Sequence, residues 1–172
     1  MRTTLQRLAL LMILLAGSLL GAAAPAQAAN GQIAGTAYLQ TTMSGGPCPA
    51  APPPAYSNYD DYPPLVLAGD LTGCWYTLVE SSDTTPSGVT FERGRELFVG
   101  SLPGGEAGTF TTTYRFEGKF APDGSEVHGR CQHPIVSGSG TGGFAGASGR
   151  VDFKDIIGDP IIYVYRGHIS LP

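Results

Sequence analysis

The chain has 172 residues, 25 of them glycine, and a formal net charge of −4 at pH 7. A mildly acidic chain without a basic cluster argues against nucleic acid and anionic membrane surfaces as partners. Beyond residue 30 the apolar residues lack the i, i+3, i+4 spacing of amphipathic helices, which excludes a helical domain.

The first 28 residues have the three parts of a secretory signal peptide. Arg2 and Arg7 form a positive start, residues 8–20 are almost entirely apolar, and 26–28 (Ala-Gln-Ala) is a small-x-small cleavage site. An uncleaved membrane anchor is the alternative, but the apolar run is shorter than the ~20 residues of a spanning helix. We therefore expect cleavage, one domain over 29–172 with no membrane span, and a secreted or cell-envelope location.

Period-two alternation of apolar and polar residues predicts β-strands in the rest of the chain. In the segment 110–120, one face carries Phe110, Thr112, Tyr114, Phe116 and Phe120. The predicted strands lie at 31–39, 64–70, 73–80, 88–93, 95–101, 108–120, 125–137 and 147–169, the last region holding two short strands broken at 158–160. About eight short strands separated by turn signals predict an all-β sandwich or barrel.

The segment 41–63 breaks this pattern because it is rich in proline. Proline has no backbone N–H, so such a segment does not pair along a ladder. We expect a long loop, which is either a lid over one end of the domain or a disordered segment.

The three cysteines are Cys48, Cys74 and Cys131. A location outside the cytoplasm permits a disulfide, and three thiols form at most one bond within the chain. The sequence leaves two pairings open, 74–131 and 48–74. The histidines and carboxylates show no metal-ligand spacing, so we expect neither a metal nor a cofactor.

The densest motif is the glycine-rich segment 138–149. Its glycines match G-x-G-x-x-G, but a dinucleotide site needs a helix after the motif, and here a period-two strand pattern follows. We interpret the segment as a tight bend between two strands, where positive φ angles and close chain approach are required. The residues of this structural turn are Gly138, Gly140, Gly142, Gly143, Phe144, Gly146 and Gly149, with Phe144 anchoring the bend in the core.

The segment 140–149, Gly-Thr-Gly-Gly-Phe-Ala-Gly-Ala-Ser-Gly, resembles the G-T-G-x-F-x-x-A-x-G stretch of dirigent proteins and allene oxide cyclases. It is more similar still to their bacterial relatives of unassigned role, the allene oxide cyclase barrel-like proteins. The preceding 129–135 and the trailing Asp155 fit the same pattern, and the resemblance covers roughly 90–170.

This resemblance implies an eight-stranded antiparallel barrel with an apolar cavity open at one end. Allene oxide cyclases and dirigent proteins hold a reactive intermediate in such a cavity, where it cyclises or couples stereoselectively. Their catalytic residues cannot be carried over, because no motif outside the glycine turn places them here. Dirigent relatives are often trimeric, so a dimer or trimer is left open.

His133 shares a predicted face with Val127, Cys131 and Ile135, so it points into the cavity if that face is the barrel interior. The alternative is a core histidine that is hydrogen-bonded to a backbone carbonyl. The candidate ligand-binding residues are His133, Glu92, Glu96, Tyr114, Phe116 and Tyr163.

Three functional hypotheses follow. The first is an exported, non-catalytic barrel that binds a small hydrophobic molecule. The second is an isomerase-like or dirigent-like enzyme, which requires two or more ionisable groups to converge inside the cavity. The third is a surface interaction protein that binds its partner through the loop 41–63.

Overall fold

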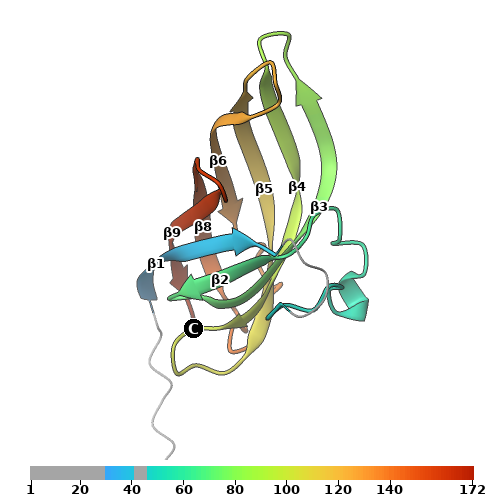
Figure 1. Ribbon diagram of the computed structural model, residues 1–172. Coiled ribbons are helices and arrows are strands. Elements are labelled where there is room, and N and C mark those ends of the chain that lie inside the picture. The colour runs from blue at the N-terminus through green and yellow to red at the C-terminus, as the bar shows by residue number, and fades with distance from the viewer. Residues whose placement is uncertain (1–29, 41–45) are drawn as a thin grey trace, which may run out of the picture.

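A computed structural model describes residues 30–40 and 46–172, and the predicted signal peptide lies outside these residues. The described chain is all-β, as predicted, and its single helical segment is a 3-10 turn, η1 (Pro54–Tyr56). The strands, shown in Figure 1, are β1 (Asn30–Leu39), β2 (Leu65–Gly69), β3 (Thr72–Thr84), β4 (Val89–Ser101), β5 (Gly108–Phe120), β6 (Glu126–Pro134), β7 (Thr141–Gly142), β8 (Ser148–Ile156) and β9 (Ile162–Ser170).

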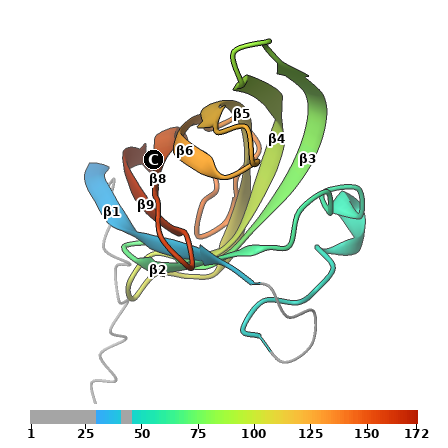
Figure 2. The same cartoon turned by 45° about the horizontal axis from the view of Figure 1, so that its top comes forward.

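Eight of these strands close into an antiparallel barrel. Neighbours follow the order β4-β3-β2-β1-β9-β8-β6-β5, and the pairing of β4 with β5 joins the two ends. Figure 2 shows the strands curving around a common axis. The two-residue β7 pairs with the start of β5 and lies outside the ring. The predicted eight-stranded antiparallel barrel is confirmed, and closure pairs the two edges that an open sheet would expose.

One predicted strand break is wrong. The segments 88–93 and 95–101 form the single strand β4, because Gly94 stays in the ladder opposite both Val79 and Tyr114. A side chain at Gly94 would crowd the ring of Tyr114, since a Cβ there would lie 2.6 Å from Cε1 of that ring. Gly94 therefore makes room for the tyrosine and does not turn the chain.

The strands differ in length, which leaves part of one edge without a neighbouring strand. β3, β4 and β5 have 13 residues each and β2 has 5, and β2 pairs with β3 no further along than Trp75. The Pro-rich loop covers the edge beyond that point. Asp61 donates its N–H to the Thr77 carbonyl (3.1 Å), and its carboxylate accepts the N–H of Val79 (2.6 Å).

The described part of this loop, 46–63, is bonded to the barrel. Cys48 forms a disulfide with Cys74 of β3, one of the two pairings left open by the sequence, and Cys131 is a free thiol. The side-chain amide of Gln40 bonds to both the backbone N–H and the carbonyl of Cys48. Loop tyrosines and the outer faces of β3 and β4 together form a small apolar cluster centred on Tyr59, Tyr76 and Leu97.

An aromatic core fills one end of the barrel. Trp75 contacts Phe110 and Phe153 edge to face, with ring centroids 5.8 and 5.2 Å apart. Phe144 contacts Phe98 in the same way at 5.5 Å. These rings are all nearly inaccessible to solvent, and such pairs add to the stabilisation from burial alone.

Phe144 reaches this core from the glycine turn. Four glycines of the turn have positive φ angles, a conformation that other residues rarely adopt. They are Gly138, Gly142, Gly146 and Gly149. The chain can therefore reverse between β6 and β8 within a short segment while a large side chain enters the barrel.

A β-bulge at the start of β6 changes which residues face inward. The pairing of β5 with β6 shifts between Lys119 and Phe120, so that Val127 is an extra residue in its strand. Val127 is 53% exposed, and its predicted place on the same face as His133 is wrong. Glu126, next to it in the chain, turns toward the barrel interior.

Candidate functional site

The barrel contains a cavity of about 570 Å³ beyond the aromatic core. Along β3 and β4 it begins at Thr77 and Glu96, two residues past the buried rings of Trp75 and Phe98. Its wall is built from six strands, β3 to β6, β8 and β9, and from the ends of β1, β2 and the Pro-rich loop. The six residues singled out in the sequence all line it: His133, Glu92, Glu96, Tyr114, Phe116 and Tyr163.

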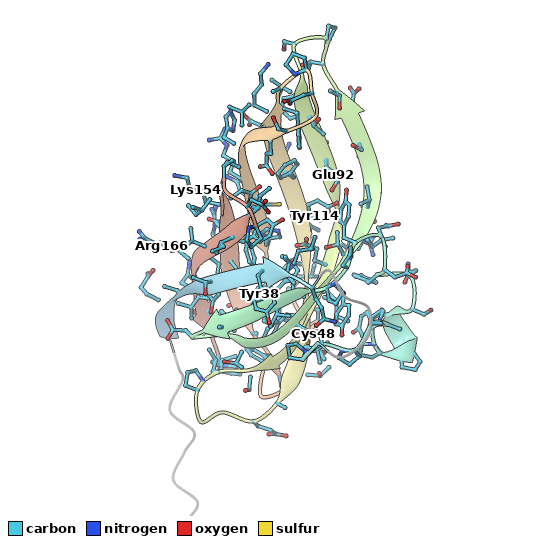
Figure 3. All side chains as sticks on the ribbon, viewed as in Figure 1. Tyr38, Cys48, Glu92, Tyr114, Lys154 and Arg166 are labelled. Carbon is cyan, nitrogen blue, oxygen red and sulfur yellow. A yellow bond between two sulfur atoms is a disulfide. The ribbon has the colours of Figure 1, made fainter. Side chains whose placement is uncertain are left out.

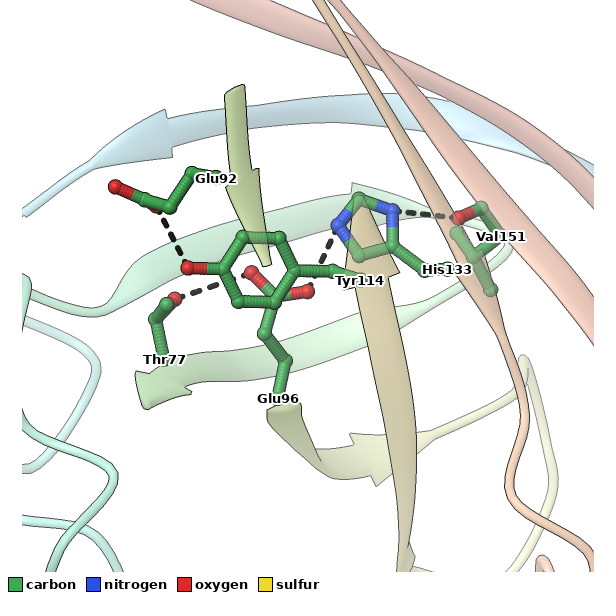
Figure 4. Close-up of polar contacts among 6 residues, drawn as sticks. All are labelled: Thr77, Glu92, Glu96, Tyr114, His133 and Val151. Atoms are coloured by element: carbon green, nitrogen blue, oxygen red, sulfur yellow. Dashed lines mark hydrogen bonds and ion pairs between the residues drawn. The ribbon is translucent and has the colours of Figure 1, made fainter. Parts of the chain in front are cut away.

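His133 and Glu96 form a buried pair on the cavity floor (Figure 4). Nε2 of His133 lies 2.7 Å from Oε2 of Glu96, and the two side chains are 2% and 7% exposed. Nδ1 of His133 lies 2.8 Å from the Val151 carbonyl. Because a carbonyl only accepts, Nδ1 carries a proton and donates it there. Nε2 is in ion-pair contact with Glu96, so His133 both bonds to a backbone carbonyl and faces the cavity.

A second carboxylate, Glu92, accepts hydrogen bonds from two tyrosines. Tyr114 of β5 donates to Oε1 at 2.6 Å, and Tyr62 of the loop donates to Oε2 at 2.8 Å. Burial, with the hydrogen bonds to Glu92, raises the pKa of both phenols. Both tyrosines therefore keep their protons and hold Glu92 as the acceptor. Glu92 and Tyr114 lie together on the inner side of the wall in Figure 3.

Two further carboxyl groups, Asp155 of β8 and Glu126 of β6, meet where these two neighbouring strands form the cavity wall. A Cβ at Gly129 would fall on Oδ2 of Asp155 and Oε1 of Glu126, so the glycine leaves the space that both oxygens occupy. Burial and the neighbouring Glu126 raise the pKa of Asp155 to about 8. Burial and these two carboxyls also raise the pKa of Tyr163 to about 12. Asp155 is therefore largely protonated at neutral pH.

Neither Glu126 nor Asp155 was among the candidate ligand-binding residues, and Asp155 entered the sequence analysis only through the family resemblance. Asp155 continues the inward-facing series Val151, Phe153, so period-two alternation predicts its direction. The direction of the Glu126 side chain depends on the bulge at Val127, and no pattern of residues in the sequence predicts that bulge. Tyr62 was also missed, because it belongs to a loop for which two arrangements were left open.

Other charged residues of these strands lie outside the cavity. Arg130 and Glu117 form an exposed ion pair at 2.9 Å across β6 and β5. Arg115 lies directly opposite Arg93 on the outer face of β5 and β4. Such exposed pairs contribute little to stability, so the ionisable groups relevant to a ligand are those of the interior.

In the part of the chain that the structure describes, no cluster of three or more histidine, cysteine, aspartate or glutamate side chains is arranged to hold a metal ion. The described residues also contain no helix that is long and apolar enough to cross a membrane. Comparison of the chain with protein-family models, curated proteins and solved structures finds no match in any of the three.

Proposed function

We propose that the barrel binds one small hydrophobic molecule in its cavity. The observation that carries this proposal is the combination of volume and wall: about 570 Å³, aromatic and aliphatic sides, and a few polar groups gathered at fixed positions. Sites for small molecules have this size and this composition. The polar side chains of the wall set the orientation of the ligand's polar end, while aromatic side chains such as Phe116 and Phe153 contact its apolar part.

The proposal includes export from the cytoplasm. The disulfide between Cys48 and Cys74 is consistent with an extracytoplasmic location, and residues 1–28 have the pattern of a signal peptide. A barrel outside the cytoplasm that carries a poorly soluble molecule is a simple role for such a cavity.

Binding can be tested with the neutral fluorophore N-phenyl-1-naphthylamine, whose emission increases in apolar surroundings. We expect one saturable site on the purified protein. Thr90→Trp places an indole at the cavity wall and should weaken binding about tenfold or more by filling the space. Thr113→Trp makes the same change at an exposed position of β5 and should leave the affinity unchanged. Equal affinities for the two variants would place the probe outside the cavity and contradict the proposal.

A catalytic role is the second candidate, and a specific observation favours it. Glu92, Glu96 and His133 converge on one cavity, which is the condition that an isomerase-like or dirigent-like enzyme must meet. In this function the cavity would hold a reactive intermediate in one orientation. The pair Glu96–His133 would donate a proton to the intermediate, or take one from it, as it cyclises.

The catalytic candidate is tested by generating phenoxyl radicals or an allene oxide in the presence of the protein and measuring the enantiomeric excess of the products. An enzyme of this kind should produce an excess that is lost in Glu96→Gln. That variant should retain the affinity for N-phenyl-1-naphthylamine, which shows that the cavity is intact. Racemic products from both reactions would remove the catalytic candidate and leave the binding function.

A further inference from the structure

The cavity wall is acidic as well as apolar. Four carboxyl side chains line it, those of Glu92, Glu96, Glu126 and Asp155, and no lysine or arginine is among the described residues of the wall. Lys154 and Arg166, on β8 and β9, point away from the barrel into solvent (Figure 3). A wall with this charge repels an anionic ligand and attracts a cation.

The hydrogen-bonding groups of the wall are acceptors for the most part. The hydroxyl protons of Tyr62 and Tyr114 are donated to Glu92. The hydroxyl proton of Thr77 is donated to Glu96, and His133 directs Nε2 to the same carboxyl group. A carboxylate or phosphate group would need several donors and finds only neutral hydroxyls, whereas a group that brings its own protons finds several acceptors.

Among the described residues, the two carboxyls of Asp155 and Glu126 contact each other and form no ion pair with a basic side chain. Asp155 is 8% exposed, faces the cavity and has a second carboxyl, that of Glu126, as its neighbour. Oε1 of Glu126 is buried and has no hydrogen-bond partner among the described residues. Buried polar atoms are nearly always hydrogen-bonded, and buried carboxylates are usually paired with a cation.

We propose that the ligand of this cavity is a hydrophobic cation, an amine with an aliphatic or aromatic body, whose ammonium group is bound between Asp155 and Glu126. This inference rests on the binding function proposed above and specifies the chemical class of the ligand. The ammonium donates to both carboxylates, and a charge-assisted bond of this kind is stronger than a neutral one. The rings of Tyr163 and Phe120, on the same wall, contribute cation–π contacts and apolar surface.

The protonation of Asp155 is consistent with this assignment. In the empty cavity its raised pKa allows one proton to take the place of a cation between the two carboxyls. The other titratable groups that face it are Cys131 of β6 and Tyr163 of β9. The thiol and the phenol remain protonated and neutral, so they do not compensate the second negative charge. An ammonium ion would do so, and its binding should release the proton.

Three ligands with the same eight-carbon chain separate charge from hydrophobicity: octylammonium, 1-octanol and octanoate. Their affinities can be measured near neutral pH by calorimetry and by displacement of N-phenyl-1-naphthylamine. We expect octylammonium to bind about tenfold or more tightly than 1-octanol, because it adds charge-assisted hydrogen bonds, and octanoate to bind most weakly.

Asp155→Asn and Glu126→Gln should each reduce the preference for octylammonium over 1-octanol to about threefold or less, and they should leave the affinity for 1-octanol nearly unchanged. The matched control Asp83→Asn removes a carboxylate from an exposed position of β3 and should not alter the preference. Two carboxyl variants are used so that the test stands if one of them folds poorly.

The outcomes distinguish the two proposals. Binding of 1-octanol or octanoate as tightly as octylammonium would overturn the cationic ligand while leaving the hydrophobic cavity in place. If the neutral fluorophore binds and none of the three eight-carbon ligands displaces it, the cationic-ligand proposal would be overturned as well. If neither the fluorophore nor any of the three eight-carbon ligands binds, the binding function itself would be contradicted.

Discussion

Replacement of Asp155 by asparagine should change how the stability of the protein depends on pH. The carboxyl of Asp155 has an ordinary pKa of 3.8, which applies to the unfolded chain, and a pKa of about 8 in the folded barrel. Between these two pH values the folded protein holds a proton that the unfolded chain has lost. The free energy of unfolding therefore falls as the pH rises from about 4 to about 8 and then levels off.

The size of this effect follows from the interval between the two pKa values. Each unit corresponds to about 1.4 kcal/mol, so the full interval sets an upper limit of roughly 6 kcal/mol. Asp155 is 8% exposed but faces an open cavity, where water screens its charge. We therefore expect a loss on the order of 2–3 kcal/mol. The charge that opposes its ionisation is that of Glu126 on β6.

The assay is urea unfolding of three proteins at about pH 5, 7 and 9. The original protein should lose stability over this range relative to Asp155→Asn, and the variant should be the more stable of the two above pH 8. The control Asp83→Asn changes an exposed carboxyl and should follow the original protein. Parallel curves for the original protein and Asp155→Asn would show that the carboxyl ionises normally and would refute the reasoning.

Three other changes have defined consequences. Replacing both cysteines of the disulfide by serine should lower the free energy of unfolding by about 3.5 kcal/mol for a sequence separation of 26 residues. The original protein under reducing conditions should show the same loss. Phe144→Ala should lower the free energy of unfolding by about 3–5 kcal/mol, because it empties part of the aromatic core. A loss below about 1 kcal/mol, measured by urea unfolding, would mean that the glycine turn does not anchor the core. Arg115→Thr removes the like-charged pair with Arg93. At low salt it should raise the free energy of unfolding by up to about 0.5 kcal/mol, and the melting temperature slightly with it. A gain that persists at high salt would point to a cause other than charge.

The strands and the barrel were predictable from the sequence because the interior selects large side chains at every second position. The inward series of β5, Phe110, Thr112 and Tyr114, is buried as the alternation requires. Alternation continues through Gly94, where a break was expected, because glycine in an extended strand keeps the same period. The predicted ends of two other strands also differ, because β3 continues to Thr84 and β6 ends at Pro134.

The carboxyl pair and the disulfide were harder to predict for a different reason. The inward direction of Glu126 depends on one extra residue in the pairing of β6 with β5, which is a property of two strands and not of either sequence. The choice of cysteines depends on which side of the barrel wall each faces. Cys74 packs in the outer cluster with the loop, whereas Cys131 faces the cavity, so those two thiols lie on opposite sides of the wall.

The aromatic core occupies only one end of the barrel, and this should produce a gradient of amide hydrogen exchange along single strands. On β4, the amides near Phe98 are covered by packed rings and should exchange only when the whole barrel unfolds. The amides near Val89, at the far end of the same strand, lie beside the cavity and should exchange through local opening of the hairpin with β3. Solvent and small molecules would then reach the interior without loss of the fold, and the slowly exchanging end would keep the strands in register while the other end moves.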